Sequence, residues 1–262
     1  MQVGLGPLCD DMGMPSALCV PDVLHSLSEA MSRIWTASTG LSPSLAPRTA
    51  LLCAALALLA VMVNRVWSVS RNLITILHEG GHACVALLLG RRLEGIRLHV
   101  DTSGVTTSVG RARGPGLTAT RFAGYAAPPL CGLGCAALVA HGRSTGVLWL
   151  LVLVLLWLVT RTRNAYGWLA ILATAGPIVA IAWYGDPVQR AMVAHGVVWF
   201  MAFGSLRTLC ELIAQRARGQ GIGSDADQLA LTGMPAWVWI TLWLLLCALN
   251  LWCTARWLVA LP

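Results

Sequence analysis

Residues 71–90 read RNLITILHEGGHACVALLLG, an apolar segment that contains the pattern His-Glu-x-x-His from His78 to His82. Side chains four residues apart lie on one face of an α-helix, so the two imidazoles can bind a single metal ion. Glu79 follows the first histidine directly, where its carboxylate can act on a metal-activated water. Since the flanks of the motif are almost wholly apolar, the sequence predicts a metal site within a membrane-spanning helix.

The composition indicates a membrane protein with several spans. Of the 262 residues, 57% are apolar and only 11% are charged, whereas soluble domains carry about 25% charged residues. The mean hydropathy is +0.71. The net charge is +7, but every basic residue is an arginine and most lie in short loops, as the positive-inside rule expects. The positive charge therefore indicates a lipid bilayer, and no nucleic acid, as the partner.

Seven apolar segments predict an all-α polytopic membrane protein with about seven transmembrane helices. Their approximate bounds are 49–66, 71–90, 122–140, 145–159, 164–184, 191–214 and 235–258. Residues 93–109 partly alternate around a turn signal at Asp101–Gly104 and predict a small β-hairpin after the metal-binding helix.

Two domains are expected. Residues 49–262 form the predicted membrane-embedded domain, and residues 1–48, which are rich in Ser, Pro and Gly, form a mobile extension. Helical spacing of apolar residues between Val23 and Trp35 favours a short interfacial helix within it, with a weak helix in a disordered tail as the alternative.

The arginines favour one orientation in the membrane. Ten of them lie in the loops after the second, fourth and sixth segments: Arg91, Arg92, Arg97, Arg111, Arg113, Arg121, Arg161, Arg163, Arg216 and Arg218. These loops are therefore expected in the cytoplasm. With seven spans, the N-terminus would then be cytoplasmic and the C-terminus would lie outside.

A catalytic zinc site uses three protein ligands and keeps a fourth position open. The acidic residues Asp225 and Asp227 precede the last segment, and Ser224 can cap a short helix there. Irregular chain at membrane depth is tolerated where it is buried or lines a wet cavity, so a ligand is expected here. The alternative is that the acidic pair only stabilises a helix N-terminus. Glu94 and Asp101 of the hairpin are the next candidates.

Two further features of the sequence allow two interpretations each. Asn164 begins the fifth segment, where its amide can donate to a developing oxyanion or contact the substrate, or simply cap the helix at the interface. Gly80 and Gly81 leave a groove beside the metal helix that suits close approach of another backbone or tight helix packing.

These motifs resemble the site-2 protease family of intramembrane zinc metallopeptidases, in its M-fifty-B-like branch. The resemblance lies in His78–Ala83, Asp101–Gly104, Gly124–Tyr125 with Pro128, Arg163–Asn164, Ser224–Ala230 followed by Leu231–Gly233, and Trp239. Ser224–Ala226 stands where the wider family has Leu-Asp-Gly. The resemblance implies one Zn²⁺ held by His78, His82 and Asp225, with Asp227 as the alternative third ligand and Glu79 as the catalytic general base.

The resemblance also implies a function, namely a zinc endopeptidase of a bacterial cell membrane that acts in regulated intramembrane proteolysis. Its substrate would be a transmembrane or membrane-proximal segment of another protein, such as an anti-sigma factor or a similar regulator. A metal transporter with the same ligands is one rival, but it would need acidic or His residues along a path through several spans. A non-proteolytic module that binds membrane segments is the other, but it would not need Glu79.

A protease must receive its substrate as an extended segment, because a helix hides its peptide groups in its own hydrogen bonds. The hairpin from Leu93 to Val109 is expected to have an unpaired edge with which such a segment can pair. We expect Gly80 and Gly81 to leave room for it, and Leu98 to be a position where proline disturbs the pairing. The alternative is a plain connecting loop.

Overall fold

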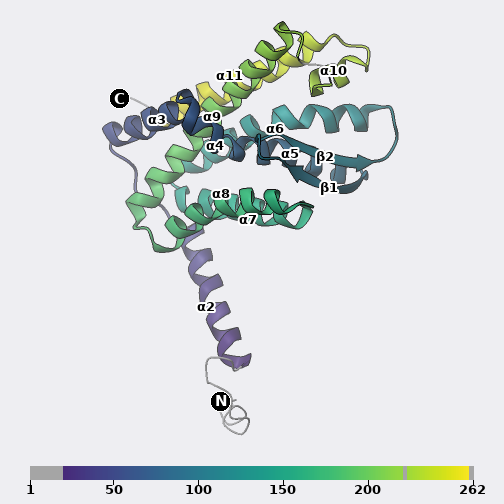
Figure 1. The fold of residues 1–262 in the computed structure, drawn as a ribbon. Coiled ribbons are helices and arrows are strands. Elements are labelled where there is room, and N and C mark those ends of the chain that lie inside the picture. The colour runs from purple at the N-terminus through teal and green to yellow at the C-terminus, as the bar shows by residue number, and fades with distance from the viewer. Residues whose placement is uncertain (1–19, 221–222, 260–262) are drawn as a thin grey trace.

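The computed structural model describes residues 20–220 and 223–259. The helices are α2 (Val20–Thr39), α3 (Pro47–Met62), α4 (Asn64–Ser70), α5 (Asn72–Leu88), α6 (Pro115–Ala140), α7 (Ser144–Arg161), α8 (Ala165–Tyr184), α9 (Pro187–Ala217), α10 (Asp225–Ala230) and α11 (Ala236–Leu258) (Figure 1). The strands are β1 (Arg92–Leu98) and β2 (Gly104–Val109), which pair antiparallel. The hairpin predicted after the motif helix is thus present. The first 19 residues of the predicted extension lie outside the described part.

The expectation of seven separate spans is not confirmed. Among the described residues, α6, α7, α8, α9 and α11 are each long and apolar enough to cross a membrane. The two helical segments before them, Pro47–Met62 and Asn64–Leu88, are long and apolar enough to cross a membrane only when they are taken together. The chain bends by 95° between them. The described chain therefore contains five candidate spans, or six if the bent pair is one span.

Contacts from α9 stabilise the break between α3 and α4. Val63 leaves the helical conformation, with φ −79° and ψ 109°. The Arg207 guanidinium donates to the carbonyl of Val61 and, at 2.7 Å, to Oδ1 of Asn64. Glu211 in turn pairs with Arg207 at 3.1 Å. Because these partners come from a distant part of the chain, the local apolar pattern of residues 49–66 does not reveal the break.

The helices α5 and α6 lie at the centre of the bundle, between α11 and the pair α7 and α8 (Figure 1). The two central helices pack closely at Gly81, where a Cβ would lie 2.6 Å from the carbonyl oxygen of Ala123. A Cβ on Gly80 would lie 3.1 Å from the side chain of Leu158. The motif glycines therefore serve helix packing, and the expectation that they leave room for a substrate is wrong.

The N-terminal helix α2 lies at the end of the bundle opposite the hairpin. α6 runs away from the hairpin to Ala140, and α7 returns to it, where Thr162 bridges Ile96 of β1. At the far end of these helices, the amide of Ser42 donates to the carbonyl of Gly142 at 2.7 Å. With seven spans, the N-terminal segment and the hairpin would lie on the same side of the membrane. The described part of residues 1–48 instead lies at the opposite end of the bundle, so this expectation is wrong for that part.

Candidate metal centre and active site

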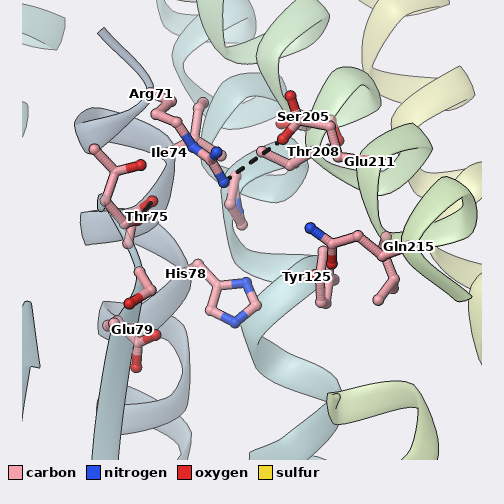
Figure 2. Close-up of a pocket in the computed structure, with 15 residues that line it drawn as sticks. Arg71, Ile74, Thr75, His78, Glu79, Tyr125, Ser205, Thr208, Glu211 and Gln215 are labelled. Atoms are coloured by element: carbon pink, nitrogen blue, oxygen red, sulfur yellow. Dashed lines mark hydrogen bonds and ion pairs between the residues drawn. The ribbon is translucent and has the colours of Figure 1, made fainter. Parts of the chain in front are cut away.

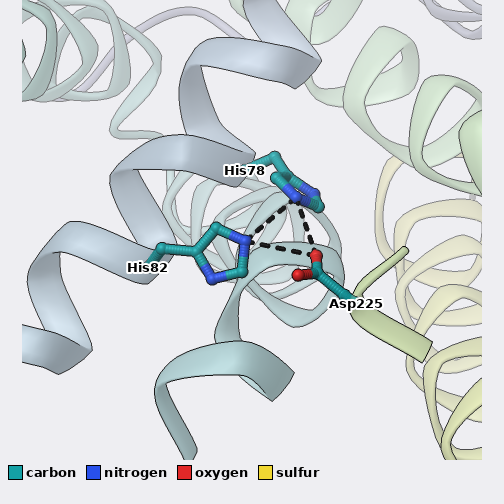
Figure 3. Close-up of side chains that lie close together, drawn as sticks. All are labelled: His78, His82 and Asp225. Carbon is teal, nitrogen blue, oxygen red and sulfur yellow. Dashed lines mark hydrogen bonds and ion pairs between the residues drawn. The ribbon is translucent and has the colours of Figure 1, made fainter. Parts of the chain in front are cut away.

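Three side chains expected to bind a metal converge in the structure (Figure 3). Nε2 of His78 lies 3.1 Å from Oδ2 of Asp225, and Nε2 of His82 lies 3.2 Å from the same oxygen. The two Nε2 atoms are 3.1 Å apart. The histidines come from consecutive turns of α5, whereas Asp225 is the first residue of α10.

This triangle fits a tetrahedral zinc ion. Zinc bonds of about 2.0 Å at the tetrahedral angle hold neighbouring ligand atoms about 3.3 Å apart, close to the three observed separations of 3.1–3.2 Å. Two imidazole nitrogens and one carboxylate oxygen are a donor set that zinc prefers. Three electron-pair donors this close repel one another unless protons or a metal ion lie between them. Both the geometry and the chemistry of the three residues therefore fit the metal.

A neighbouring helix orients the second histidine. Nδ1 of His82 lies 2.7 Å from the carbonyl oxygen of Thr120 in α6. Because a carbonyl can only accept, Nδ1 carries the proton and Nε2 is left with the lone pair that a metal requires. Gly124, one turn further along α6, lets that helix approach the ligands, since a Cβ there would lie 2.3 Å from Nε2 of His82.

The hairpin positions the expected general base. Glu79 is only 4% exposed. Its Oε2 accepts a 2.6 Å hydrogen bond from the hydroxyl of Thr106 in β2. Gly104, at the start of β2, lies so close to the carboxylate that a Cβ would be 2.7 Å from Oε1. Thr106 and Gly104 therefore hold the carboxylate beside the metal ligands. The sequence alone assigns neither residue to the site, because it reveals only the β-branched character of Thr106 and the turn character of Gly104.

The two candidate acids before the last span have different surroundings. Asp225 joins the histidines, and α10 lies outside the candidate spans. Burial raises the pKa of Asp225, but the two adjacent histidines, His78 and His82, lower it by more, so the pKa of this carboxyl lies below its ordinary value. Asp227 instead pairs with Arg216 of α9 and accepts at 3.1 Å from the amide of Gly223. Asp227 thus fixes the turn that presents Asp225.

Asn164 and the other candidate acids lie away from the metal ligands. Both polar atoms of the Asn164 amide bond to the backbone of Leu98, with Oδ1 accepting from its N–H at 3.2 Å and Nδ2 donating to its carbonyl at 2.6 Å. This geometry supports no oxyanion role. Among the described residues, neither Glu94 nor Asp101 belongs to the metal group. The pKa of Asp101 is lowered by hydrogen bonds from Ser103.

The open edge of the hairpin is on β2. On β1, the side opposite β2 is already covered by Asn164 and by the amide of Arg163, which donates to Ile96 at 2.9 Å. Leu98 therefore does not lie on an open edge, and the expectation that proline there would disturb substrate pairing is wrong. The residues Gly104–Ser108 of β2 line a cavity of about 520 Å³ together with the metal ligands.

A second cavity of about 250 Å³ extends from the same site between α5 and α9 (Figure 2). His78 and Glu79 lie in the walls of both cavities. Polar side chains line much of the second cavity: Arg71, Thr75, Ser205, Thr208, Glu211 and Gln215. Such a lining can hold water within the bundle.

The fold and the site define a helical membrane protein with a zinc-type His/His/Asp cluster and a buried carboxylate beside it. Comparison with protein families agrees, because residues 51–254 match the model described as Peptidase M50B-like. That match covers more than half of the chain, so the chain belongs to the Peptidase M50B-like family. No curated protein and no solved structure matches it.

Proposed function

We propose that the protein is an intramembrane zinc metalloendopeptidase that hydrolyses peptide bonds in or near transmembrane segments of other proteins. The observation that carries this proposal is the triangle of His78, His82 and Asp225 with the buried Glu79 beside it. Membership of a peptidase family supports the same chemistry. That a substrate is an anti-sigma factor or a similar regulator rests on the resemblance alone.

In this mechanism, Nε2 of His78, Nε2 of His82 and Oδ2 of Asp225 would hold the zinc. Zinc supplies, when bound there, Lewis-acid activation of a water molecule and of the peptide carbonyl. Glu79 accepts the proton of the attacking water and delivers it to the departing amine nitrogen. Thr106 keeps the carboxylate in position through its 2.6 Å hydrogen bond. Burial of Glu79 limits competing contacts with bulk water.

The open edge of β2 is the proposed receptor for the substrate backbone. In an antiparallel pair, successive residues direct their N–H and C=O groups alternately toward and away from the partner strand. Leu98 and Ile96 of β1 bond outward, to Asn164 and Arg163, so their register partners Gly104 and Thr106 also direct their groups outward. Ser108 follows the same alternation. An extended segment paired here lies in the cavity that the metal ligands line.

The hairpin end of the bundle is proposed to face the cytoplasm of a bacterial cell, because most of the loop arginines lie there. Counting the bent pair as one span gives six crossings. Both chain ends then lie outside, which reverses the orientation of the N-terminus expected from seven spans. The test is protease digestion of a tag fused before Met1 in cells without an outer membrane. Digestion supports the six-span topology, and protection contradicts it.

The two rival functions have less support. A transporter needs ligands along a path through several spans, but the described residues contain one group of three or more metal-type ligands. A non-catalytic module that binds membrane segments has no use for a buried carboxylate beside the ligands.

The proposal is tested by the metal content of the purified protein and by its activity. We expect about one zinc per chain in the wild type, loss of that zinc in His78→Ala, and cleavage of a co-purified single-span reporter that stops when a strong chelator removes the metal. A metal-free protein that still cleaves the reporter would contradict the metallopeptidase assignment. Zinc uptake into sealed vesicles without cleavage would favour the transporter.

A further inference from the structure

A third cavity lies at the end of the bundle opposite the hairpin, far from the metal ligands. It opens to the surface, has a volume of about 390 Å³ and is lined by residues of α2, α7, α8 and α9. Its lining contains Ser32, Arg33, Thr36, Trp149, Trp183 and Arg190. The proposed peptidase mechanism uses none of these residues.

Two arginines from distant parts of the chain meet around Trp183 in this cavity. The guanidinium carbon of Arg33 lies 4.8 Å from the centre of the Trp183 ring. Arg190 donates from a terminal nitrogen to the carbonyl of Trp183 at 3.4 Å. In the described part of the chain, neither arginine forms an ion pair with a carboxylate, and the lining includes no acidic residue. The cavity therefore carries two positive charges that its own walls do not neutralise.

The cavity is also rich in hydrogen-bond donors that have no partner. Nε of Arg190 and Nε1 of Trp149 are both buried, and neither makes a hydrogen bond. Buried donors of this kind destabilise the fold unless a ligand or water accepts from them. The hydroxyls of Ser32 and Thr36 add donors in the same lining. A phosphodiester has only acceptor oxygens and a negative charge, so it complements this set of groups.

The position of the cavity fits a lipid headgroup. Trp183 is next to the last residue of α8, and Arg190 lies in the first turn of α9, so both are at a membrane interface, where tryptophans gather. The adjoining helix α2 exposes an apolar face that includes Leu24, Leu27 and Trp35, as expected of a helix lying among headgroups. A soluble phosphate would gain nothing from that apolar surface.

We propose that this cavity binds the phosphodiester headgroup of an anionic glycerophospholipid and thereby fixes α2 to the transmembrane bundle. Arg33 and Arg190 contact the phosphate oxygens, with Trp149 as a further donor. This site is independent of the peptidase reaction, and its test does not require a substrate.

The test is native mass spectrometry of the full chain, purified free of lipid in a neutral detergent and titrated with phosphatidylglycerol. We expect one tightly bound lipid, and a loss of affinity of about tenfold or more in Arg33→Gln, because one charge-assisted hydrogen bond is removed. Arg33 lies outside the candidate spans, on exposed helix surface, so this variant keeps the bundle intact. Arg48→Gln is the matched control, since it removes the same charge at the same end of the molecule but from outside the cavity.

Equal binding by Arg33→Gln and the wild type would overturn the proposal, as would a loss of the same size in Arg48→Gln. Two competitors distinguish the sources of phosphate. Inorganic phosphate at the lipid's concentration should not displace phosphatidylglycerol, and displacement would show a site for free phosphate instead. Phosphatidylcholine should bind more weakly, because its choline brings a positive charge to two arginines. Equal binding of the two lipids would exclude selection for an anionic headgroup.

Discussion

The hydroxyl of Thr106 in β2 donates a 2.6 Å hydrogen bond to Oε2 of Glu79 in α5. This contact joins the hairpin to α5 at Glu79, the proposed general base. Hydrogen bonds to a charged group contribute about 1.5–3 kcal/mol. The hairpin is therefore part of the proposed catalytic apparatus as well as a surface for the substrate.

Thr106→Val removes this hydrogen bond while keeping the β-branched shape of the side chain. We expect kcat to fall about 10- to 100-fold, with zinc content unchanged and KM nearly so. Thr107→Val is the control, because the side chain of Thr107 is exposed on the other face of the strand. Steady-state cleavage of a single-span reporter gives both constants. Wild-type kcat in Thr106→Val would show that Glu79 does not depend on the hairpin.

Gly124→Ala should eliminate zinc binding although alanine favours helix by about 1 kcal/mol over glycine. The added methyl group would lie 2.3 Å from Nε2 of His82 and 2.7 Å from Nε2 of His78, where the metal ligands must be. Gly134→Ala on the same helix is the control, since a Cβ there meets nothing within 4 Å. Zinc per chain by mass spectrometry and helicity by circular dichroism decide the outcome. A Gly124→Ala protein with full zinc would mean that the two helices are further apart.

The two acids before the last span should differ in their effect on the metal. Asp225→Asn removes the charged ligand oxygen, and we expect zinc affinity to fall by more than about 100-fold, beyond the usual effect of residues that only support a ligand. Asp227→Asn weakens the contact with Arg216 and should reduce affinity by about tenfold or less. Competition with a chelator of known affinity measures both. The opposite order would mean that Asp227 is the ligand.

Ser108→Pro tests whether the open edge of β2 receives the substrate. Proline removes the outward N–H at this position, and the loss of one backbone hydrogen bond to the substrate should raise KM about fivefold or more. Ser108→Ala separates this effect from the loss of the hydroxyl, which accepts a 3.3 Å hydrogen bond from Arg91. If both variants cleave the reporter with equal constants, the substrate does not pair at this position.

The parts of the site that the sequence predicts are those that depend on local spacing. His78 and His82 are one helical turn apart, so a single helix suffices to bring them together. The hairpin follows from a turn signal between two strand-like runs. The preference for Asp225 over Asp227 rests on the family resemblance, because both acids precede the last span and only packing against α5 distinguishes them.

Features that depend on contacts between distant segments could not be predicted. The break at Val63 requires Arg207 from α9 to satisfy the end of α3. Because the sequence does not reveal this break, it predicts seven spans where the described chain has five or six candidates, and it places α2 at the wrong end of the bundle. The side-chain amide of Asn164 could donate a hydrogen bond to an oxyanion, but in the structure it is hydrogen-bonded to the backbone of Leu98 in the hairpin. The tight approach at Gly124 is invisible until α6 is placed against the two histidines.

The most direct test of the central claim is Glu79→Gln, assayed for bound zinc and for cleavage of a co-expressed single-span reporter in the same preparation. The amide keeps the size of the side chain and leaves all three ligands in place, but it cannot accept the proton of the attacking water. We predict wild-type zinc content together with a loss of cleavage of at least about 100-fold. Cleavage at the wild-type rate by zinc-loaded Glu79→Gln protein would contradict the proposed function of this site.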